Sequence, residues 1–345
     1  MKAFLTGGSG FIGFHVAGAL INQGIEVRAL VRDETLAPAR ELSRIGAETV
    51  KGDVRDPGPV RLAVKGCGLV FHLAADYRLW APNPKEMYRT NVEGTVNVLS
   101  AALEENVERV VYTSSVGALA ASVDGTPVNE DTPVKFEDMC GDYKKSKFLA
   151  EREAERFFRK GLPVVIVNPS TPVGAMDRKP TPTGKMIVDF LNGKMPAYLD
   201  TGLNFVGVRD VAHGHILAMK SGRPGDKYIL GNRNLTLKEF FALVGFAAGL
   251  TPPRVKLPYL PVLAAAYVNE AISRVTRKPP VIPLAGVKMA RKYMFYDNSK
   301  AVRDLGFSPA PVEREIEDAV IWFRENGYVE KLKYCKSKRP VEAGQ

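Results

Sequence analysis

A tyrosine and a lysine one helical turn apart are the residues of this chain best placed to do chemistry. Tyr143 and Lys147 lie in a stretch, residues 142–160, whose pattern predicts a long helix. Side chains four positions apart share one helix face, with about 5–6 Å between their Cβ atoms. A free tyrosine titrates at about pH 10, so proton exchange near neutral pH requires its anion to be stabilised by about 4 kcal/mol. The Lys147 ammonium is a suitable source of that stabilisation.

Two serines mark the carboxyl end of a predicted buried strand, residues 110–114. Ser114 is its last residue, and Ser115 follows it. Parallel strands present ligand contacts from their carboxyl ends, so we expect both hydroxyls to face a cleft. A hydroxyl there can hold a substrate oxygen while Tyr143 transfers the proton.

A glycine-rich turn joins the first predicted strand, residues 3–6, to a helix pattern at residues 11–22. Gly7, Gly10 and Gly13 form a G-x-x-G-x-x-G spacing, one residue wider than the dinucleotide fingerprint. Free N–H groups and the positive end of the helix dipole converge at such a turn, where a pyrophosphate can bind. We expect Gly7 to permit the turn, Gly10 to let the backbone approach the phosphates, and Gly13 to let the helix pack closely.

Strands and helices alternate through the first half of the chain, which predicts an α/β fold. Further strands are expected at residues 26–31, 48–51, 69–73, 110–114 and 164–168, with helices between them at 36–45, 60–64, 86–105 and 142–160. Short apolar strands separated by helices indicate a Rossmann-type, doubly wound parallel sheet. We expect residues 1–170 and about 206–248 to form this domain, and about 171–205 and 249–330 to form a smaller mixed substrate lobe. Residues 331–345 are expected to be a disordered tail.

Composition narrows the class of protein. The 345 residues are 45% hydrophobic and 25% charged, with a net charge of +10. Cys67, Cys140 and Cys335 include no C-x-x-C pair, which argues against disulfides or a zinc site and fits a reducing cytoplasm. Without a nucleic-acid motif, the positive charge favours a basic surface or an anionic cofactor or substrate.

No stretch is long and apolar enough to predict a membrane-spanning helix. The nearest candidate, residues 257–272, contains prolines and polar residues and is expected to be a packed helix of the second lobe. A peripheral membrane contact is the alternative. The four histidines are not joined by a cysteine or carboxylate cluster, so no metal site is predicted.

Taken together, these motifs resemble the extended short-chain dehydrogenase/reductase family. The resemblance rests on Thr6-Gly7-x-x-Gly10-x-x-Gly13, Asp53, His72-Leu-Ala-Ala75, Asn91-Val-Glu-Gly-Thr95, Ser115, Tyr143-x-x-x-Lys147 and Asn168-Pro169. A closer similarity, to the bacterial hopanoid-associated sugar epimerase group, rests on Ala74-Ala-Asp-Tyr-Arg-Leu-Trp80, Val167-Asn-Pro-Ser-Thr-Pro-Val-Gly174 and Lys179-Pro-Thr-Pro-Thr-Gly184. Asp189-Phe-Leu-Asn-Gly193 and Met289-Ala-Arg-Lys292 extend it.

The resemblance implies a Ser115, Tyr143 and Lys147 triad, with Asn91 supporting the lysine or a proton relay. It also implies a nicotinamide cofactor and a homodimer. The residues expected to contact the cofactor are Gly7, Gly10, Phe11, Ile12, Gly13, Arg32, Asp53, Val54, Leu73, Ala74, Ala75, Ser114, Tyr143, Lys147, Asn168 and Pro169.

The end of the second strand bears on which nicotinamide cofactor binds. NAD-specific members place an acid at the strand tip, where this chain has Val31 followed by Arg32. An arginine there can bind the 2′-phosphate of NADP, and the run also resembles NADP-dependent dihydroflavonol reductases. NADP is therefore favoured, although Asp33 could serve an NAD site if the strand runs longer.

The expected activity is hydride exchange with a secondary alcohol or ketone carbon of a small molecule. A reductase is favoured by Arg32, a sugar epimerase by the family resemblance, and a non-catalytic NADP sensor is a third alternative. A dehydratase is disfavoured because no acid stands beside Ser115. The main substrate-site candidates are Asp76, Tyr77, Arg78, Thr171, Asn204 and Arg209, followed by Trp80, Cys140, Pro172 and Phe205.

Overall fold

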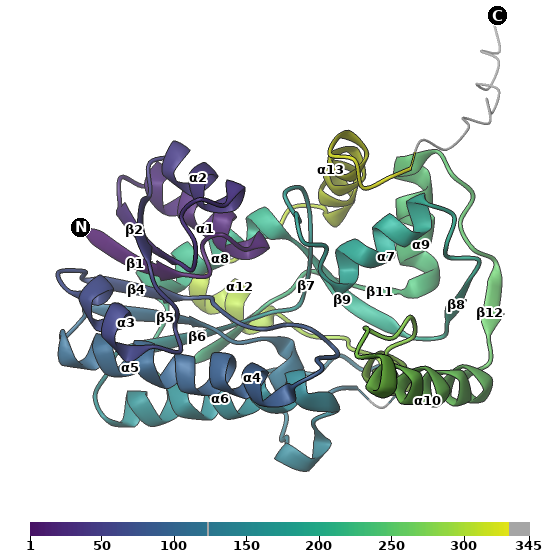
Figure 1. The fold of residues 1–345 in the computed structure, drawn as a ribbon, viewed down its shortest axis with the longest axis horizontal. Coiled ribbons are helices and arrows are strands. Elements are labelled where there is room, and N and C mark those ends of the chain that lie inside the picture. The colour runs from purple at the N-terminus through teal and green to yellow at the C-terminus, as the bar shows by residue number, and fades with distance from the viewer. Residues whose placement is uncertain (123, 331–345) are drawn as a thin grey trace, which may run out of the picture.

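A parallel sheet of seven strands forms the larger part of the molecule (Figure 1). The structure is a computed structural model and describes residues 1–122 and 124–330. The strands are β1 (Lys2–Thr6), β2 (Glu26–Val31), β3 (Glu48–Lys51), β4 (Leu69–His72), β5 (Arg109–Thr113), β6 (Val164–Pro169) and β10 (Lys227–Leu230). Their order is β10-β6-β5-β4-β1-β2-β3, and neighbouring strands all pair in parallel. The predicted Rossmann-type α/β sheet is confirmed.

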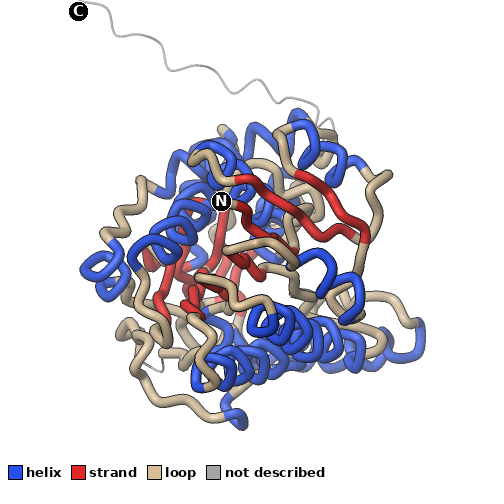
Figure 2. Tube along the Cα trace, turned by 90° about the vertical axis from the view of Figure 1, so that its left-hand side faces the viewer, coloured by secondary structure: helices blue, strands red, loops and turns tan. Residues whose placement is uncertain are grey.

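Alternate residues of each central strand enter two separate cores, one on each face of the sheet. In β1, Leu5 packs in one core and Phe4 in the other; in β6, Val165 and Ile166 are divided in the same way. Helices cover both faces, as Figure 2 shows. One face carries α1 (Phe11–Asn22), α2 (Ala37–Arg44), α8 (Val208–Ser221) and α12 (Ser299–Leu305), and the other carries α3 (Pro57–Val64), α5 (Gly94–Glu104) and α6 (Gly141–Arg159).

The order of the strands reverses beside β1. From β1 the chain proceeds outward to β2 and β3, then returns to place β4 on the opposite side of β1. The loops that leave the carboxyl ends of β1 and β4 therefore diverge, and ligands of open α/β sheets bind in the crevice that this leaves. The glycine turn stands at this point.

A smaller lobe contains a mixed sheet and a separate core (Figure 1). The sheet has the order β11-β9-β7, with β7 (Thr171–Val173) parallel and β11 (Arg233–Thr236) antiparallel to β9 (Gly202–Gly207). β8 (Ala197–Leu199) and β12 (Val255–Leu257) form a separate, two-stranded parallel sheet. The helices of the lobe are α7 (Pro182–Leu191), α9 (Leu237–Ala248), α10 (Tyr259–Thr276), α11 (Leu284–Met289) and α13 (Val312–Glu325).

The structure differs from the expected domain division in two helices and in β11, which pairs with β9 in the smaller lobe. Phe240 and Phe241 of α9 pack in the core of the smaller lobe, whereas Ala301 and Leu305 of α12 pack against the large sheet. Amphipathic spacing reveals that a helix has a buried face but not which sheet covers it, so sequence order assigned both to the wrong side. The expected tail, 331–345, lies outside the described residues.

One predicted helix is interrupted. Residues 86–105 form α4 (Pro84–Tyr88), a π-helical turn (Arg89–Glu93) and α5 rather than one regular helix. A π-helical turn often marks a functional site, and this one contains Asn91.

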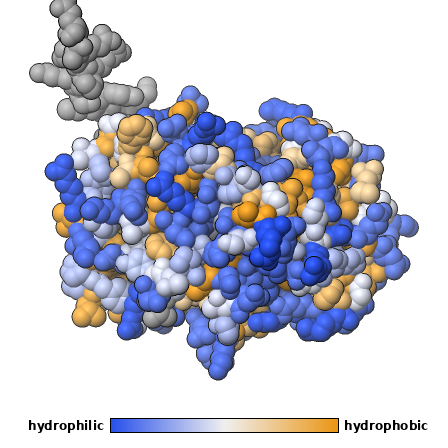
Figure 3. Space-filling model, turned by 180° about the vertical axis from the view of Figure 1, so that it is seen from behind, coloured by the Kyte–Doolittle hydropathy of each residue, from blue (hydrophilic) through white to orange (hydrophobic). Residues whose placement is uncertain are grey.

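The surface seen from behind mixes hydrophilic and apolar residues (Figure 3). None of the helices in the described part of the chain has the length and apolar character needed to cross a bilayer.

Candidate active site

The glycine turn forms a cradle at the amino end of α1. Gly7 has φ +73°, and a Cβ there would lie 2.7 Å from the Ala74 backbone nitrogen. A Cβ on Gly13 would lie 2.0 Å from the Gly7 carbonyl oxygen. At the helix start, Gly10 donates its N–H to that same oxygen at 2.9 Å, and no side chain caps the terminus. The remaining N–H groups and the positive helix end are thus available to a pyrophosphate, and the residues present fit a dinucleotide.

A chain of buried hydrogen bonds fixes the segment after β4 beside this turn. Thr6 Oγ1 accepts the N–H groups of Leu73 and Ala74, both at 3.1 Å, so its own proton points to His72 Nδ1 at 2.6 Å. His72 Nε2 then faces Thr95 Oγ1 at 3.0 Å. Burial lowers the pKa of His72 to about 3, so the ring is neutral and serves as a structural link.

The predicted lysine is buried and held in place, one turn from the predicted tyrosine. Lys147 Nζ donates to the Thr113 carbonyl oxygen at 2.8 Å and to the Tyr112 hydroxyl at 3.1 Å. Burial lowers the pKa of Lys147 to about 8, and the nearby carboxylate of Glu151 opposes that shift. The lysine therefore carries a positive charge at neutral pH.

Tyr143 and Ser115 lie together at the carboxyl end of β5. Burial raises the pKa of the Tyr143 phenol, and a hydrogen bond with Ser115 works in the opposite direction. Ser115 Oγ also accepts the N–H of Gly117 at 3.0 Å. A Cβ on Gly117 would lie 3.2 Å from Ser115 Oγ and 3.5 Å from Tyr143 Cε1, so glycine leaves the two hydroxyl-bearing residues room to meet.

Glu151 is a buried residue of this site that the sequence reasoning missed. Its carboxylate accepts Ser114 Oγ at 2.5 Å, Asn168 Nδ2 at 2.8 Å and Lys227 Nζ at 2.7 Å. The Asn168 amide also donates to the Ser115 carbonyl oxygen at 3.1 Å. The signal was its place four residues after Lys147, which puts a second charged group on the buried helix face.

These contacts bear on two expectations from the sequence. We expected the Ser114 hydroxyl to face the cleft, but it is buried and held by Glu151. The side chain of Asn91, which we expected to support the lysine or a relay, clamps the loop after β4. This side chain accepts the Asp76 N–H at 2.6 Å and donates to the Asp76 carbonyl and to Ser146 Oγ, each at 2.9 Å.

An exposed arginine follows the carboxyl end of β2. Arg32 is exposed just beyond the strand, and the described residues provide no ion pair for it. Asp33 Oδ1 accepts the Thr35 N–H at 2.9 Å and the Thr35 hydroxyl at 2.6 Å, which lowers the pKa of Asp33.

Asp53, the expected adenine contact, is bound by Arg55. Arg55 reaches Asp53 Oδ2 at 2.7 Å through Nη2, and the same guanidinium reaches Glu86 at 2.7 Å. These contacts lower the pKa of Asp53. The carboxylate thus holds the loop after β3, close to the crevice.

Several candidate substrate residues have structural partners instead. Asn204 is buried, and its amide bonds to Asn234 Oδ1 at 2.8 Å and to the Asn232 N–H at 2.9 Å, which ties β9 to β11. Arg209 pairs with Glu315 at 2.7 Å and with Asp318, on α13. Both side chains join elements of the fold, and polar residue type alone could not distinguish that role from ligand binding.

The other candidates lie in the loops and the short strand around the crevice. Asp76 accepts Arg78 Nε at 2.9 Å, and Tyr77 donates its hydroxyl to the Lys179 carbonyl oxygen at 3.1 Å. Thr171 begins β7, where it pairs with Phe205 of β9.

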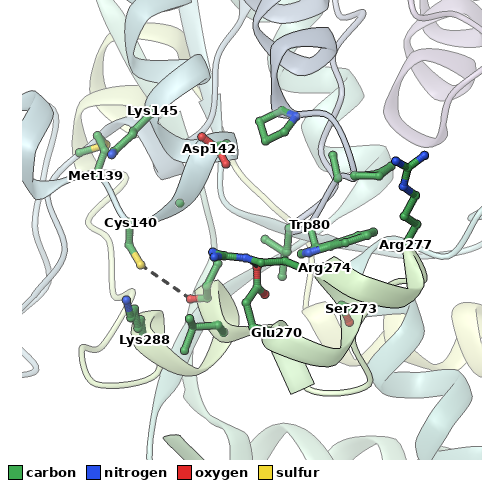
Figure 4. Close-up of a pocket in the computed structure, with 17 residues that line it drawn as sticks. Trp80, Met139, Cys140, Asp142, Lys145, Glu270, Ser273, Arg274, Arg277 and Lys288 are labelled. Atoms are coloured by element: carbon green, nitrogen blue, oxygen red, sulfur yellow. Dashed lines mark hydrogen bonds and ion pairs between the residues drawn. The ribbon is translucent and has the colours of Figure 1, made fainter. Parts of the chain in front are cut away.

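A cavity of about 760 Å³ opens beside the amino end of α6 (Figure 4). Met139, Cys140 and Asp142 lie on one side of it, and α10 and α11 supply most of the other side. Trp80 also lines it, whereas Ser115 and Tyr143 do not. The cavity therefore lies beside the predicted catalytic residues, which do not line it. It contains two of the residues expected near substrate, Trp80 and Cys140.

Comparison with known proteins agrees with this architecture. A model of the NAD dependent epimerase/dehydratase family matches residues 3–231. A putative dihydroflavonol 4-reductase from Synechocystis sp. is 42% identical over 330 residues, which cover 94% of this chain and 95% of that protein. Sterol demethylase protein B from Methylococcus capsulatus is 30% identical over 331 residues, which cover 95% of this chain and 100% of that protein.

Solved structures share the fold along nearly the whole chain. The crystal structure of gox2253 has 45% identity and a TM-score of 0.85, covering 95% of this chain and 99% of that one. UDP-glucose 4-epimerase from Thermus thermophilus, in complex with NAD, has 24% identity and a TM-score of 0.74, covering 94% and 99%. The chain therefore belongs to the NAD-dependent epimerase/dehydratase family, whose members are enzymes of the extended short-chain dehydrogenase/reductase type.

Proposed function

We propose that this enzyme is an NADPH-dependent reductase that converts a ketone to a secondary alcohol, with Ser115, Tyr143 and Lys147 as its catalytic residues. The observation that carries this choice is the end of β2, where the exposed Arg32 follows a strand tip without a carboxylate. A guanidinium there can bind a 2′-phosphate by charge-assisted hydrogen bonds, whereas NAD sites use an acid for the ribose hydroxyls. The phosphorylated cofactor usually serves net reduction. Similarity to a putative dihydroflavonol 4-reductase supports the same proposal.

The competing acid at this edge has other partners. β2 ends at Val31, and Val31 itself is buried in the sheet core. Asp33 therefore lies beyond the strand, where its carboxylate accepts two hydrogen bonds from Thr35. Both bonds end on Oδ1, so an NAD site built on Asp33 would have to use Oδ2 alone or break a bond to Thr35.

When bound, the nicotinamide would supply the hydride for reduction. The cradle of Gly7, Gly10 and Gly13 would bind the pyrophosphate through backbone N–H groups. Ser115 would hold the carbonyl oxygen of the substrate, and the Tyr143 hydroxyl would give that oxygen its proton.

Lys147 completes the proposed mechanism by charge. Because Thr113 and Tyr112 hold its ammonium one turn from Tyr143, its charge is available to stabilise the tyrosinate left by proton transfer. The hydride and the proton together account for the two hydrogens of the alcohol product.

Cofactor binding to an arginine variant tests the proposal. Calorimetry with NADPH and NADH should show tighter binding of NADPH to the wild-type enzyme. Arg32→Ala should weaken NADPH binding by about 10- to 100-fold, since one charge-assisted hydrogen bond contributes about 1.5–3 kcal/mol, and should hardly change NADH binding. Arg44→Ala, an exposed arginine at the other end of α2, is the matched control for net charge. Equal loss for both cofactors, or no loss, would refute the assignment of Arg32.

A sugar epimerase is the second candidate, because the family model and NAD-bound neighbours point to it. An epimerase oxidises its substrate transiently, returns the hydride and keeps its cofactor. Denaturing the purified protein and identifying the released nucleotide separates the two. Stoichiometric NAD or NADH would favour the epimerase, and an empty protein that prefers NADPH would favour the reductase.

A further inference from the structure

Helix α10 presents its apolar side to solvent. Leu260, Val268 and Val275 are 74%, 60% and 85% exposed, and Ala264 and Ala271 are exposed between them. Their spacing of four, four, three and four residues places all five on one helix face. We call these five residues the α10 stripe.

The opposite side of the helix is mixed, with half-buried Val262 and Leu263 beside Asn269 and Glu270. Only Ala266 and Ser273 of α10 are buried, and Glu270 and Ser273 line the cavity of Figure 4. A surface helix of a water-soluble domain normally keeps charged and polar residues on its outer face, whereas the outer face of α10 carries the stripe. Contiguous exposed apolar residues with a polar rim mark an interaction surface.

Further exposed apolar side chains extend this surface at both ends of the helix. Val255 is 58% exposed, Val281 is 86% exposed, and Ile272 borders the stripe at 55%. Exposed apolar side chains are therefore also present in the segments that flank α10.

The residues around the stripe are predominantly basic. Residues 251–283 contain five cations, Arg254, Lys256, Arg274, Arg277 and Lys278, and one acid, Glu270. All five cations are exposed. Lys256 pairs with Asp200 at 3.1 Å and Arg274 with Glu270 at 3.7 Å, and the described residues pair none of the other three. This excess of positive charge is complementary to an anionic partner.

An aromatic side chain stands at the border between the apolar and basic parts. Tyr267 is 51% exposed, and Lys288 Nζ lies 5.3 Å from the centroid of its ring. Tyrosines with an apolar ring and a polar tip are enriched where hydrocarbon meets headgroups, and lysine stems lie along apolar surface with the ammonium in water.

We propose that the α10 stripe docks on an anionic lipid bilayer, with α10 lying in the plane of the headgroups. The stripe would enter the boundary between headgroups and acyl chains, and Arg254 and Lys278 would contact lipid phosphates. A second copy of this chain is the weaker occupant, because a symmetric pairing through this face would bring like charges together. The inner side of α10 lines the cavity beside the catalytic residues, so docking would hold that cavity at the membrane surface.

Vesicle flotation with the full chain tests this proposal. The protein should float with vesicles of equimolar phosphatidylcholine and phosphatidylglycerol, and much less with phosphatidylcholine alone. Val268→Glu/Val275→Glu should weaken binding to the anionic vesicles by about tenfold or more, because two apolar side chains lose their burial in lipid. Arg254→Ala/Lys278→Ala should weaken it by about fivefold for each charge removed.

The matched control is Leu62→Glu/Ile321→Glu. These residues are 74% and 51% exposed on α3 and α13, away from α10, and the double change adds the same charge. It should weaken binding much less than the stripe variant. Circular dichroism and NADPH binding should match the wild type in every variant, because all the changed side chains are exposed.

Two results would overturn the proposal. One is failure of the wild-type protein to float with anionic vesicles. The other is equal binding by the stripe variant and the control. Light scattering after gel filtration tests the competing occupant, a second copy of the chain. If the wild-type protein is a dimer that does not bind lipid, and Val268→Glu/Val275→Glu converts it to a monomer, the stripe is a contact between copies.

Discussion

Gly13→Ala is the perturbation whose effect follows most directly from the structure. The added Cβ would lie 2.0 Å from the Gly7 carbonyl oxygen and 2.7 Å from its carbonyl carbon. Ordinary contacts of a Cβ begin at 3.4 Å, so α1 and the turn must separate by well over an ångström. Both atoms met are backbone, so no side-chain rotation relieves the clash. We expect a loss of about 1–3 kcal/mol in the free energy of unfolding and failure of the displaced turn to bind cofactor.

Gly18→Ala is the matched control on the same helix. A Cβ at Gly18 would have no heavy atom within 4 Å. Alanine is the better helix former, so this variant should gain about 0.5–1 kcal/mol and bind cofactor normally. Urea unfolding and NADPH calorimetry measure both effects. Normal cofactor affinity in Gly13→Ala would refute the close packing of turn and helix and the role given to the cradle.

Three further predictions concern α6. Tyr143→Phe should abolish turnover while cofactor affinity in calorimetry stays within about twofold; retained turnover would remove Tyr143 from the mechanism. Burial lowers the pKa of Lys147 to about 8, so the charge that stabilises the tyrosinate is present below that pH. The turnover number for reduction should therefore fall as the pH rises through about 8, and a flat profile would contradict the role of Lys147. Lys144 is buried with its pKa lowered to about 8 from 10.5, so charging it costs the folded state about 3 kcal/mol at pH 7. Lys144→Met should raise the free energy of unfolding at pH 7 by up to about that amount, and this gain should shrink as the pH rises from 8 to 10.5. Urea unfolding midpoints of both proteins across this pH range test the prediction. A difference in stability that does not change with pH would contradict it.

Much of the large sheet was predictable because its signals are local. The strands at residues 26–31 and 48–51 and the helix at 11–22 were predicted at their exact bounds. The capping box of Thr236 and Glu239 at the start of α9 is a signal of the same local kind, and both of its hydrogen bonds are present. Apolar runs, helical spacing, caps and glycine turns are properties of neighbouring residues, so the sequence contains them.

In the candidate site too, the features that depend on neighbouring residues were predictable and those that depend on distant residues were not. The glycine cradle and the Tyr143–Lys147 spacing depend on a few adjacent residues and stayed within reach of sequence reasoning. Glu151, by contrast, gains its importance from Ser114, Asn168 and Lys227, which reach it from other elements of the fold. No local pattern states which of many buried polar residues will meet.

The sequence by itself determined the class of fold, the place of the dinucleotide turn and the helix face that carries the tyrosine and lysine. Only the tertiary structure decided that Asn204 and Arg209 bind protein partners, that α9 and α12 pack on the sheets they do, and that the apolar side of α10 faces outward. The physical reason is the distance along the chain over which each kind of signal acts. Periodicity and backbone constraints act over a few residues, whereas the partner of a polar or apolar face is chosen by segments far away in the chain.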